Sequence, residues 1–254
     1  MKSKGIKFFI GISSLFVSLI QLALASSPGL QANVFGGISH IQIPSSLIHI
    51  SPQETDLMEK DNATDTTFGA GIAYVLPLER ILNNHPNSII KNLLFGVDYF
   101  YYNTQLGGGV QLYESAKFTN YDYTLNLRTN RLMLNIQWLF LPQWQNISPY
   151  VGAGIGGTRI RTRYYEQPKV FEMIYNGELN LTSRTNTNFV YSLTVGVRKP
   201  LTSQIELFLS YLYTDFGSAY TSCQSTLNVI ESPIKIKVAT QTGLLGISYT
   251  FDIV

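Results

Sequence analysis

Four charged residues in or beside apolar segments are the first candidates for chemistry in this sequence. Asp98 and Glu206 each lie in a segment where every second residue is apolar, and each occupies the alternate, more polar positions. Neighbouring side chains in a strand point to opposite faces, so both carboxylates are expected on the less apolar face. The candidate cations on that face are Arg198 and Arg128. Because an unpaired charge away from water is costly, the four residues are predicted to form an internal network of ion pairs and hydrogen bonds.

A second group of charges consists of Arg159, Arg161 and Arg163, at alternate positions of one segment. If the alternation continues from Val151 and Ile155, the three guanidinium groups share the apolar face, just beyond its last apolar residue. Guanidinium groups bind phosphate through two parallel hydrogen bonds. The spacing therefore predicts contact with phosphate groups.

Two alternatives for these arginines stay open. A β-bulge at the glycines of residues 156–157 would turn the three side chains inward. Alternatively, the segment is a solvated strand extension whose arginines pair with loop acids such as Glu166 and Glu172.

Metal and cofactor chemistry have little support in the sequence. Acids cluster in one stretch, which holds Glu54, Asp56, Glu59, Asp61 and Asp65. The stretch lacks the spacing and central glycine of a calcium-binding loop, so a solvated acidic loop is predicted. The single Cys223 excludes an internal disulfide, and the three histidines, His40, His49 and His85, lack ligand spacing. We expect no metal site and no cofactor.

The first 25 residues have the features of a secretory signal peptide. Three lysines open the chain, an apolar run follows at residues 8–24, and Ala23-Leu24-Ala25 forms a small-x-small cleavage site. Export with cleavage near Ala25 leaves residues 26–254 as one domain. Without those three lysines the chain's 18 basic residues fall to 15, against 16 acidic residues. No positive field then favours nucleic acid as a partner.

The rest of the chain consists of segments that alternate apolar with small or polar residues. Eight are expected as strands: residues 33–42, 67–76, 91–103, 120–140, 149 onward, 188–197, 204–213 and 240–251. No later stretch has the roughly 18 apolar residues of a membrane helix, so a membrane-spanning mature chain must be a closed barrel. Its apolar face would meet lipid, and its other face would line the lumen that holds the predicted charge network. Aromatic girdles would include Tyr74, Tyr99, Tyr101, Trp138, Tyr211, Tyr213 and Tyr249.

The segment of residues 120–140 is too long for one crossing of about 10 residues. Its apolar positions also change parity, which predicts a β-bulge between Arg128 and Arg131 and a first half that projects beyond the bilayer. With a periplasmic N-terminus, the external loops are expected at residues 43–66, 104–119, 164–187 and 216–239. The shorter periplasmic turns are expected at residues 77–90, 141–148 and 198–203.

The run Pro-Tyr-Val-Gly-Ala-Gly-Ile-Gly at residues 149–156 and the ending Gly-Ile-Ser-Tyr-Thr-Phe at residues 246–251 carry a resemblance. With the eight segments and the export signal, the mature chain resembles the small OmpA/opacity-type outer-membrane β-barrel family. The resemblance implies an all-β, eight-stranded antiparallel transmembrane barrel with long extracellular loops in a Gram-negative outer membrane. Its implied partners are outer-membrane lipids, lipopolysaccharide phosphates and the barrel-assembly machinery. Residues 252–254 follow the terminal aromatic Phe251, so the signal read by that machinery is imperfect.

The expected role is structural or in surface recognition, such as adhesion or host interaction through the loops. The alternative is a narrow diffusion pore with a gated lumen, which requires a continuous wet channel. A remote alternative is a lipid A-modifying enzyme, which in similar barrels uses a histidine and a serine near the external rim. Here only His40 or His49 could meet a rim serine, Ser39 or Ser46, with no acid to orient it. We therefore expect no catalytic residues.

Overall fold

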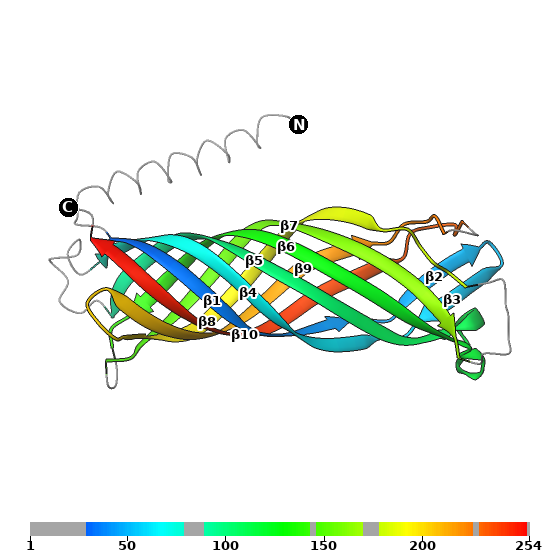
Figure 1. The fold of residues 1–254 in the computed structure, drawn as a ribbon, viewed down its shortest axis with the longest axis horizontal. Helices are drawn as coiled ribbons and strands as arrows, with labels where there is room; N and C mark the ends of the chain where they lie inside the picture. Colours follow the sequence, from blue (N-terminus) through cyan, green and yellow to red (C-terminus); the bar gives the residue numbers. More distant parts are fainter. Residues whose placement is uncertain (1–28, 79–88, 143–145, 170–177, 226–228, 253–254) are drawn as a thin grey trace, which may run out of the picture.

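The computed structural model describes residues 29–78, 89–142, 146–169, 178–225 and 229–252. They form one antiparallel sheet in which eight strands close into a ring, because β5 pairs with β6 in addition to the pairings of the strand order. The ring strands are β1 (Gly29–Ile43), β4 (Asp61–Pro77), β5 (Ile90–Gln111), β6 (Tyr121–Phe140), β7 (Ser148–Pro168), β8 (Arg184–Pro200), β9 (Ile205–Tyr220) and β10 (Lys235–Asp252). The predicted eight-stranded barrel is confirmed (Figure 1).

A short hairpin completes the sheet at one end of the barrel. It consists of β2 (Ser46–Ser51) and β3 (Glu54–Met58), and β3 joins the ring by pairing Leu57 and Met58 with Gln111 and Val110 of β5. Two single-turn 3₁₀ helices, η1 (Leu112–Glu114) and η2 (Ala116–Phe118), follow β5 at the same end. The start of β1 and the end of β10 lie at the opposite end (Figure 1). No helix among the described residues has the length and hydropathy to span a membrane.

The half of the barrel that contains the start of β1 and the end of β10, here called the lower half, carries an apolar outer belt. Large apolar side chains are exposed there on every ring strand, among them Val34, Phe68, Ile72, Tyr99, Leu134, Ile155, Phe189, Leu193, Leu209, Tyr211, Leu245, Ile247 and Tyr249. Exposed apolar residues in such number are typical of a surface that faces lipid. The belt ends where outward positions become polar, for example at Asn130 of β6 and Arg159 of β7.

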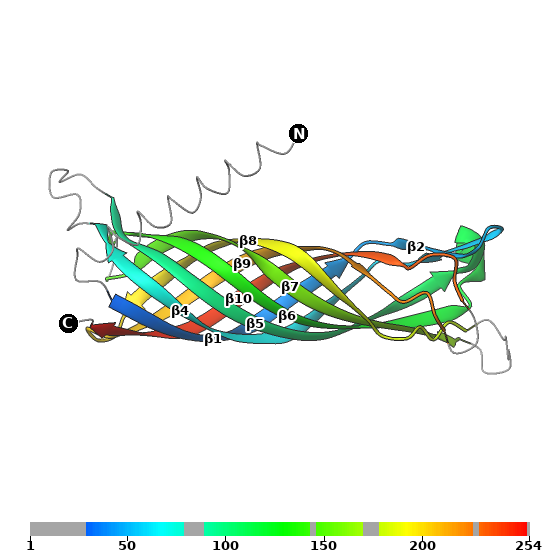
Figure 2. The same cartoon turned by 90° about the horizontal axis from the view of Figure 1, so that it is seen from above.

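Above the belt the barrel continues as a second, water-exposed half, here called the upper half. β5, β6 and β7 have 22, 20 and 21 residues, about twice the length that crosses a bilayer. Both views show this elongated shape (Figures 1 and 2). Much of what the sequence predicts as external loop is therefore strand, because β5 runs on to Gln111 and the hairpin occupies most of residues 43–66.

The predicted β-bulge in β6 is wrong. β6 pairs with β7 without a shift of register from Tyr121 to Leu139, and its only irregularity against β5 lies near Ile90. The apolar positions change parity because the surroundings change. Below the belt edge, Leu134 points outward into lipid, whereas above it Leu125 is fully buried and points inward, away from water.

These inward side chains form a packed apolar core inside the upper half of the barrel. The core includes Ile43, Ile48, Met58, Leu106, Val110, Tyr123, Leu125, Ile160, Tyr164, Leu181, Phe216, Ile230 and Ile236, each at most 2% exposed. Residues of β2, β3 and the segment before β10 thus fill the barrel from its end. The upper half is organised like a soluble protein, with polar residues outside and apolar residues inside.

Candidate functional site

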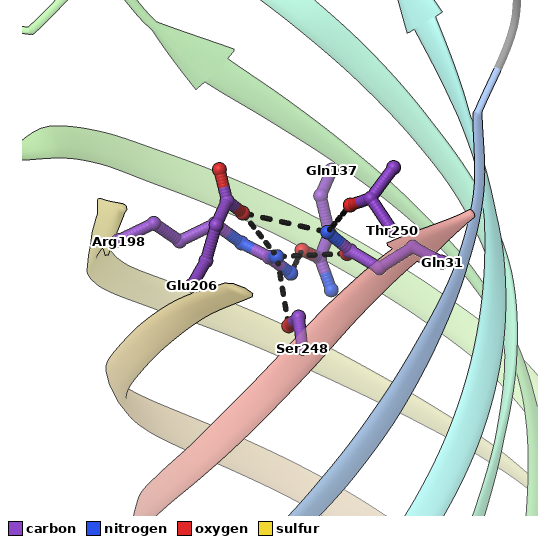
Figure 3. Close-up of polar contacts among 6 residues, drawn as sticks. All are labelled: Gln31, Gln137, Arg198, Glu206, Ser248 and Thr250. Atoms are coloured by element: carbon purple, nitrogen blue, oxygen red, sulfur yellow. Dashed lines mark hydrogen bonds and ion pairs between the residues drawn. The ribbon is translucent and has the colours of Figure 1, made fainter. Parts of the chain in front are cut away.

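Arg198 of β8 closes the lower lumen. Its guanidinium is buried, and Nη1 donates to Oε1 of Gln31 at 2.9 Å while Nη2 donates to Oε1 of Gln137 at 2.9 Å (Figure 3). Nη1 also lies 3.4 Å from a carboxylate oxygen of Glu206 and 3.3 Å from Oγ of Ser248. Gln31 and Gln137 belong to β1 and β6, neither of which pairs with β8. These bonds therefore cross the lumen.

Arg131 of β6 closes the lumen further up. Its guanidinium carbon lies 3.8 Å from the ring centroid of Phe100, 5.5 Å from that of Tyr102 and 5.6 Å from that of Phe216. Nη1 donates to Oγ1 of Thr214 on β9, and β9 does not pair with β6. The side chain is 1% exposed, and its Nε and Nη2 have no hydrogen-bond partner among the described residues. Cation–π contacts with the three rings therefore stabilise a charge that is only partly hydrogen-bonded.

Asp98 of β5 lies between the two arginines. Nδ2 of Asn135 donates to Oδ2 of Asp98 at 2.7 Å. Asp98 and Arg198 line the same small cavity, of about 30 Å³, with Asn33, whose side-chain oxygen has no hydrogen-bond partner among the described residues. A polar cavity of this size has room for one or two water molecules.

The structure brings together three of the four residues of the predicted charge network. Asp98, Arg198 and Glu206 all face the lumen, and the structure joins Arg198 to Glu206 directly. The prediction that Arg128 faces the lumen is wrong: its side chain is exposed on the outer wall, where Nε donates to Oδ1 of Asn103 at 3.3 Å. Without the expected bulge, Arg128 has the outward parity. The inward arginine is Arg131, which an uninterrupted alternation through β6 would have identified.

Arg159, Arg161 and Arg163 lie exposed on the outer wall of β7, just above the apolar belt. The register of β6 against β7 is continuous, so the alternative in which a bulge turns them inward is wrong. Pairing with Glu166 is also excluded, because Glu166 faces the interior, where it accepts hydrogen bonds from Tyr164 and Leu179. Glu172 lies outside the described residues.

The upper end of the barrel holds a cavity of about 520 Å³ between the hairpin, η1 and β7. Three carboxylates line it, those of Glu54, Asp56 and Glu166, together with apolar residues such as Ile230. Burial raises the pKa of Glu166 to about 7, although hydrogen bonds from Tyr164 and from the Leu179 N–H oppose the shift. Burial also raises the pKa of Asp56.

The residues considered for catalysis are not brought together. His40 and His49 lie on the outer side of their strands. Nδ1 of each is hydrogen-bonded at 3.2 Å to a threonine hydroxyl, that of Thr64 for His40 and that of Thr55 for His49. Ser39 and Ser46 are buried on the inner side. His85 lies outside the described residues. Among the side chains that the structure describes, no group of three or more His, Cys, Asp or Glu residues has the arrangement of a metal site.

Comparison with known proteins gives one family. Residues 14–251 match the model of the outer membrane protein β-barrel domain. Similar solved structures include Neisserial surface protein A (16% identity, 89% of this chain and 98% of that chain, TM-score 0.41). Another is Ail, the attachment invasion locus protein of Yersinia pestis, in complex with the heparin analogue sucrose octasulfate (14%, 88% and 99%, TM-score 0.36). OprG from Pseudomonas aeruginosa is a third (14%, 88% and 96%, TM-score 0.40). No curated protein sequence matches the chain.

Proposed function

This chain belongs to the outer membrane protein β-barrel domain family, and on that premise we propose that it is a surface-recognition protein. Its barrel holds a rigid extension above the outer membrane, and the end of that extension binds a surface or host ligand. The protein is neither a pore nor an enzyme. Export with cleavage near Ala25, insertion by the barrel-assembly machinery and lipopolysaccharide as a neighbour are parts of the same proposal.

The observation that carries this proposal is the apolar core above the lipid belt. Tyr123, Leu125, Ile160 and Tyr164 are at most 1% exposed, in a region where the outer wall already faces water. Such packing makes the upper strands as rigid as a folded soluble domain. A barrel that only crosses a bilayer does not need it, whereas loops and strand ends that bind a partner benefit from a rigid scaffold.

Exposed apolar side chains at the far end support a contact surface there. Leu47, Tyr113, Phe118 and Val229 are 44%, 62%, 52% and 73% exposed on β2, η1, η2 and the segment before β10. Large apolar side chains exposed to water are common in binding surfaces. We expect these four residues to contribute most to binding.

A narrow pore is the second candidate, favoured by the small cavity that Asp98, Asn135 and Arg198 line in the lower lumen. Conduction would require both arginines to leave their positions and the apolar core of the upper half to open as well. A lipid A-modifying enzyme has less support, since the rim histidines and serines lie on opposite faces of their strands.

Two measurements, one on displayed protein and one on the refolded mature protein, test the proposal. Bacteria that display the protein should adhere to host epithelial cells, and the variant Leu47→Ser/Tyr113→Ser/Phe118→Ser should lose that adherence. Leu201→Ser is the control, because Leu201 is similarly exposed (54%) at the opposite end of the barrel. In planar bilayers the refolded wild type should be silent. Unchanged adherence of the triple variant together with discrete channel openings would replace recognition by transport.

A further inference from the structure

We propose that Arg128, Arg159, Arg161 and Arg163 form one binding site for the phosphate groups of an outer-leaflet glycolipid. The site, here called the outer arginine cluster, lies on the wall of the barrel and is separate from the recognition surface proposed above. It rests on the proposed placement of the upper half outside the outer membrane, but not on the recognition surface.

The register of the sheet brings the four arginines together. Arg128 of β6 is paired directly with Arg161 of β7, while Asn130 and Asn126 are paired with Arg159 and Arg163. Alternate residues of a strand are roughly 6.7 Å apart, and paired residues of neighbouring strands are about 5 Å apart. The cluster is therefore about 13 Å long and two strands wide, which suits a headgroup that carries two phosphates.

The height of the cluster fits a lipid headgroup. On β7 the outward positions run from Ile155, 54% exposed in the apolar belt, through Gly157 to Arg159. Gly157 is flanked by the exposed Leu132 of β6 and the exposed Phe189 of β8. Arg159 is thus the first outward residue of β7 above the last apolar row. Arginine side chains at this level reach the phosphates while the acyl chains lie against the belt.

The electrostatics of this wall also indicate an anion. Two arginines directly opposite each other in a cross-strand pair repel, which destabilises a sheet unless something compensates. Among the described residues, Arg159, Arg161 and Arg163 make no ion pair or hydrogen bond through their side chains, and Arg128 bonds only to the neutral Asn103. The outward neighbours on β5 and β8 are Asn103, Gln105, Thr185 and Thr187, none of them acidic.

Phosphate esters match this arrangement better than carboxylates do, because each phosphate accepts bidentate bonds from more than one guanidinium. The belt directly below favours a lipid over a polyanion from solution, since only a lipid would use both the arginines and the apolar row. Divalent cations can also bridge lipid phosphates to one another. If the arginines bind the phosphates directly in place of such cations, the lipid should stay bound after the cations are removed.

Native mass spectrometry of the refolded mature protein, titrated with diphosphorylated lipid A in detergent with EDTA, tests the proposal. We expect the wild type to retain the lipid. Arg159→Ala/Arg161→Ala/Arg163→Ala should bind at least about tenfold more weakly, and adding Arg128→Ala should weaken binding further. The control Lys60→Ala/Lys235→Ala/Lys237→Ala removes three positive charges elsewhere on the upper half and should bind like the wild type.

Three results would overturn the proposal. One is equal binding by the arginine variant and the wild type. Another is equal binding of dephosphorylated lipid A, which would assign the affinity to the acyl chains alone. The third is arginine-dependent binding of a sulfated heparin oligosaccharide without binding of lipid A, which would make the cluster a site for a soluble polyanion.

A second variant keeps the test decisive if the alanine variant fails the gel-shift test for a folded barrel. The matching Arg→Lys variant keeps the charge of the outer arginine cluster. It should bind lipid A more weakly than the wild type, because lysine lacks the bidentate geometry. Equal binding by a folded lysine variant would contradict recognition through paired guanidinium bonds.

Discussion

Arg131 on β6 and Thr214 on β9 are joined by a hydrogen bond that crosses the lumen. The three aromatic rings around the same guanidinium fill the space beside that bond. Nearer the lower end, Arg198 makes a second set of crossing bonds, to Gln31 and Gln137. The lumen is thus closed twice, by two arginines on different strands.

Removing both arginines should not open a channel. We expect the Arg131→Ala/Arg198→Ala variant to be as silent in planar bilayers as the wild type, because the apolar core still fills the upper half of the barrel. Discrete openings of the wild type or of the folded double variant would contradict this account of the lumen.

Arg198 should also contribute strongly to the stability of the barrel. Arg198→Ala leaves Gln31, Gln137 and Ser248 without their shared donor and the Glu206 carboxylate without its countercharge, at a cost on the order of 3 kcal/mol. Glu206→Gln should cost less, because Glu206 is partly exposed and the amide oxygen still accepts a bond from Arg198. Urea midpoints of the folded band on unheated gels measure both effects. Lys199→Ala, at the next, exposed position, is the control and should change nothing.

The upper end of the barrel should become less stable as pH rises from about 4.5 to about 7. Burial raises the pKa of Glu166 in the folded state to about 7, above its ordinary value of 4.5, so in this range the folded state binds a proton that the unfolded state releases. The stabilising contribution of the protonated Glu166 is fully present below pH 4.5 and is lost as the pH rises through 7. Its loss lowers the free energy of unfolding by on the order of 3 kcal/mol at most.

Hydrogen exchange measures this opening at the backbone bonds that join β7 to residues 179–181, Glu166 N–H to Leu179 and Leu181 N–H to Tyr164. After correction for the intrinsic rate, protection should be higher at about pH 5 than at about pH 8. Glu166→Gln, which cannot ionise, should remove most of the difference. Equal protection at both pH values in the wild type would argue against a protonated Glu166.

The sequence predicts the lower half of the barrel well because one rule applies there. Lipid outside and polar groups inside fix the facing of each strand, and the expected orientations of Asp98 and Glu206 match their positions in the structure. Above the belt, water replaces lipid, and the same alternation has the opposite meaning. A reversal of facing then looks like a bulge, and for this reason the sequence pattern places Arg128 inside and misses Arg131.

The upper core could not be predicted from alternation, because its members come from segments far apart in the sequence. Ile48 of β2, Leu106 of β5 and Ile230 meet only once the hairpin has folded into the end of the barrel. Nor does the sequence reveal the burial of Glu166, which depends on the chain at Leu179 packing across β7. The signal peptide lies outside the described residues and stays a prediction.

Gly71 of β4 should be required for the full stability of the barrel, because the side chain of Asp98 occupies the space beside it. A Cβ at Gly71 would collide with the carboxylate of Asp98, its partner across the strand pair, and would lie 2.9 Å from the backbone oxygen of Val97. Gly71→Ala should therefore displace Asp98 from Asn135 and lower the urea midpoint clearly, by a free energy of about 1–3 kcal/mol.

A double-mutant cycle identifies the cause of that loss. Asp98→Ala removes the carboxylate that collides, so Gly71→Ala/Asp98→Ala should be more stable than the sum of the two single effects predicts. Gly157→Ala is the matched control, because a Cβ there would stand in open space on the outer wall, with no neighbouring atom within 4 Å. If Gly71→Ala and Gly157→Ala shift the urea midpoint equally, the loss comes from glycine's general effect on a strand, and Asp98 does not need the space above Gly71.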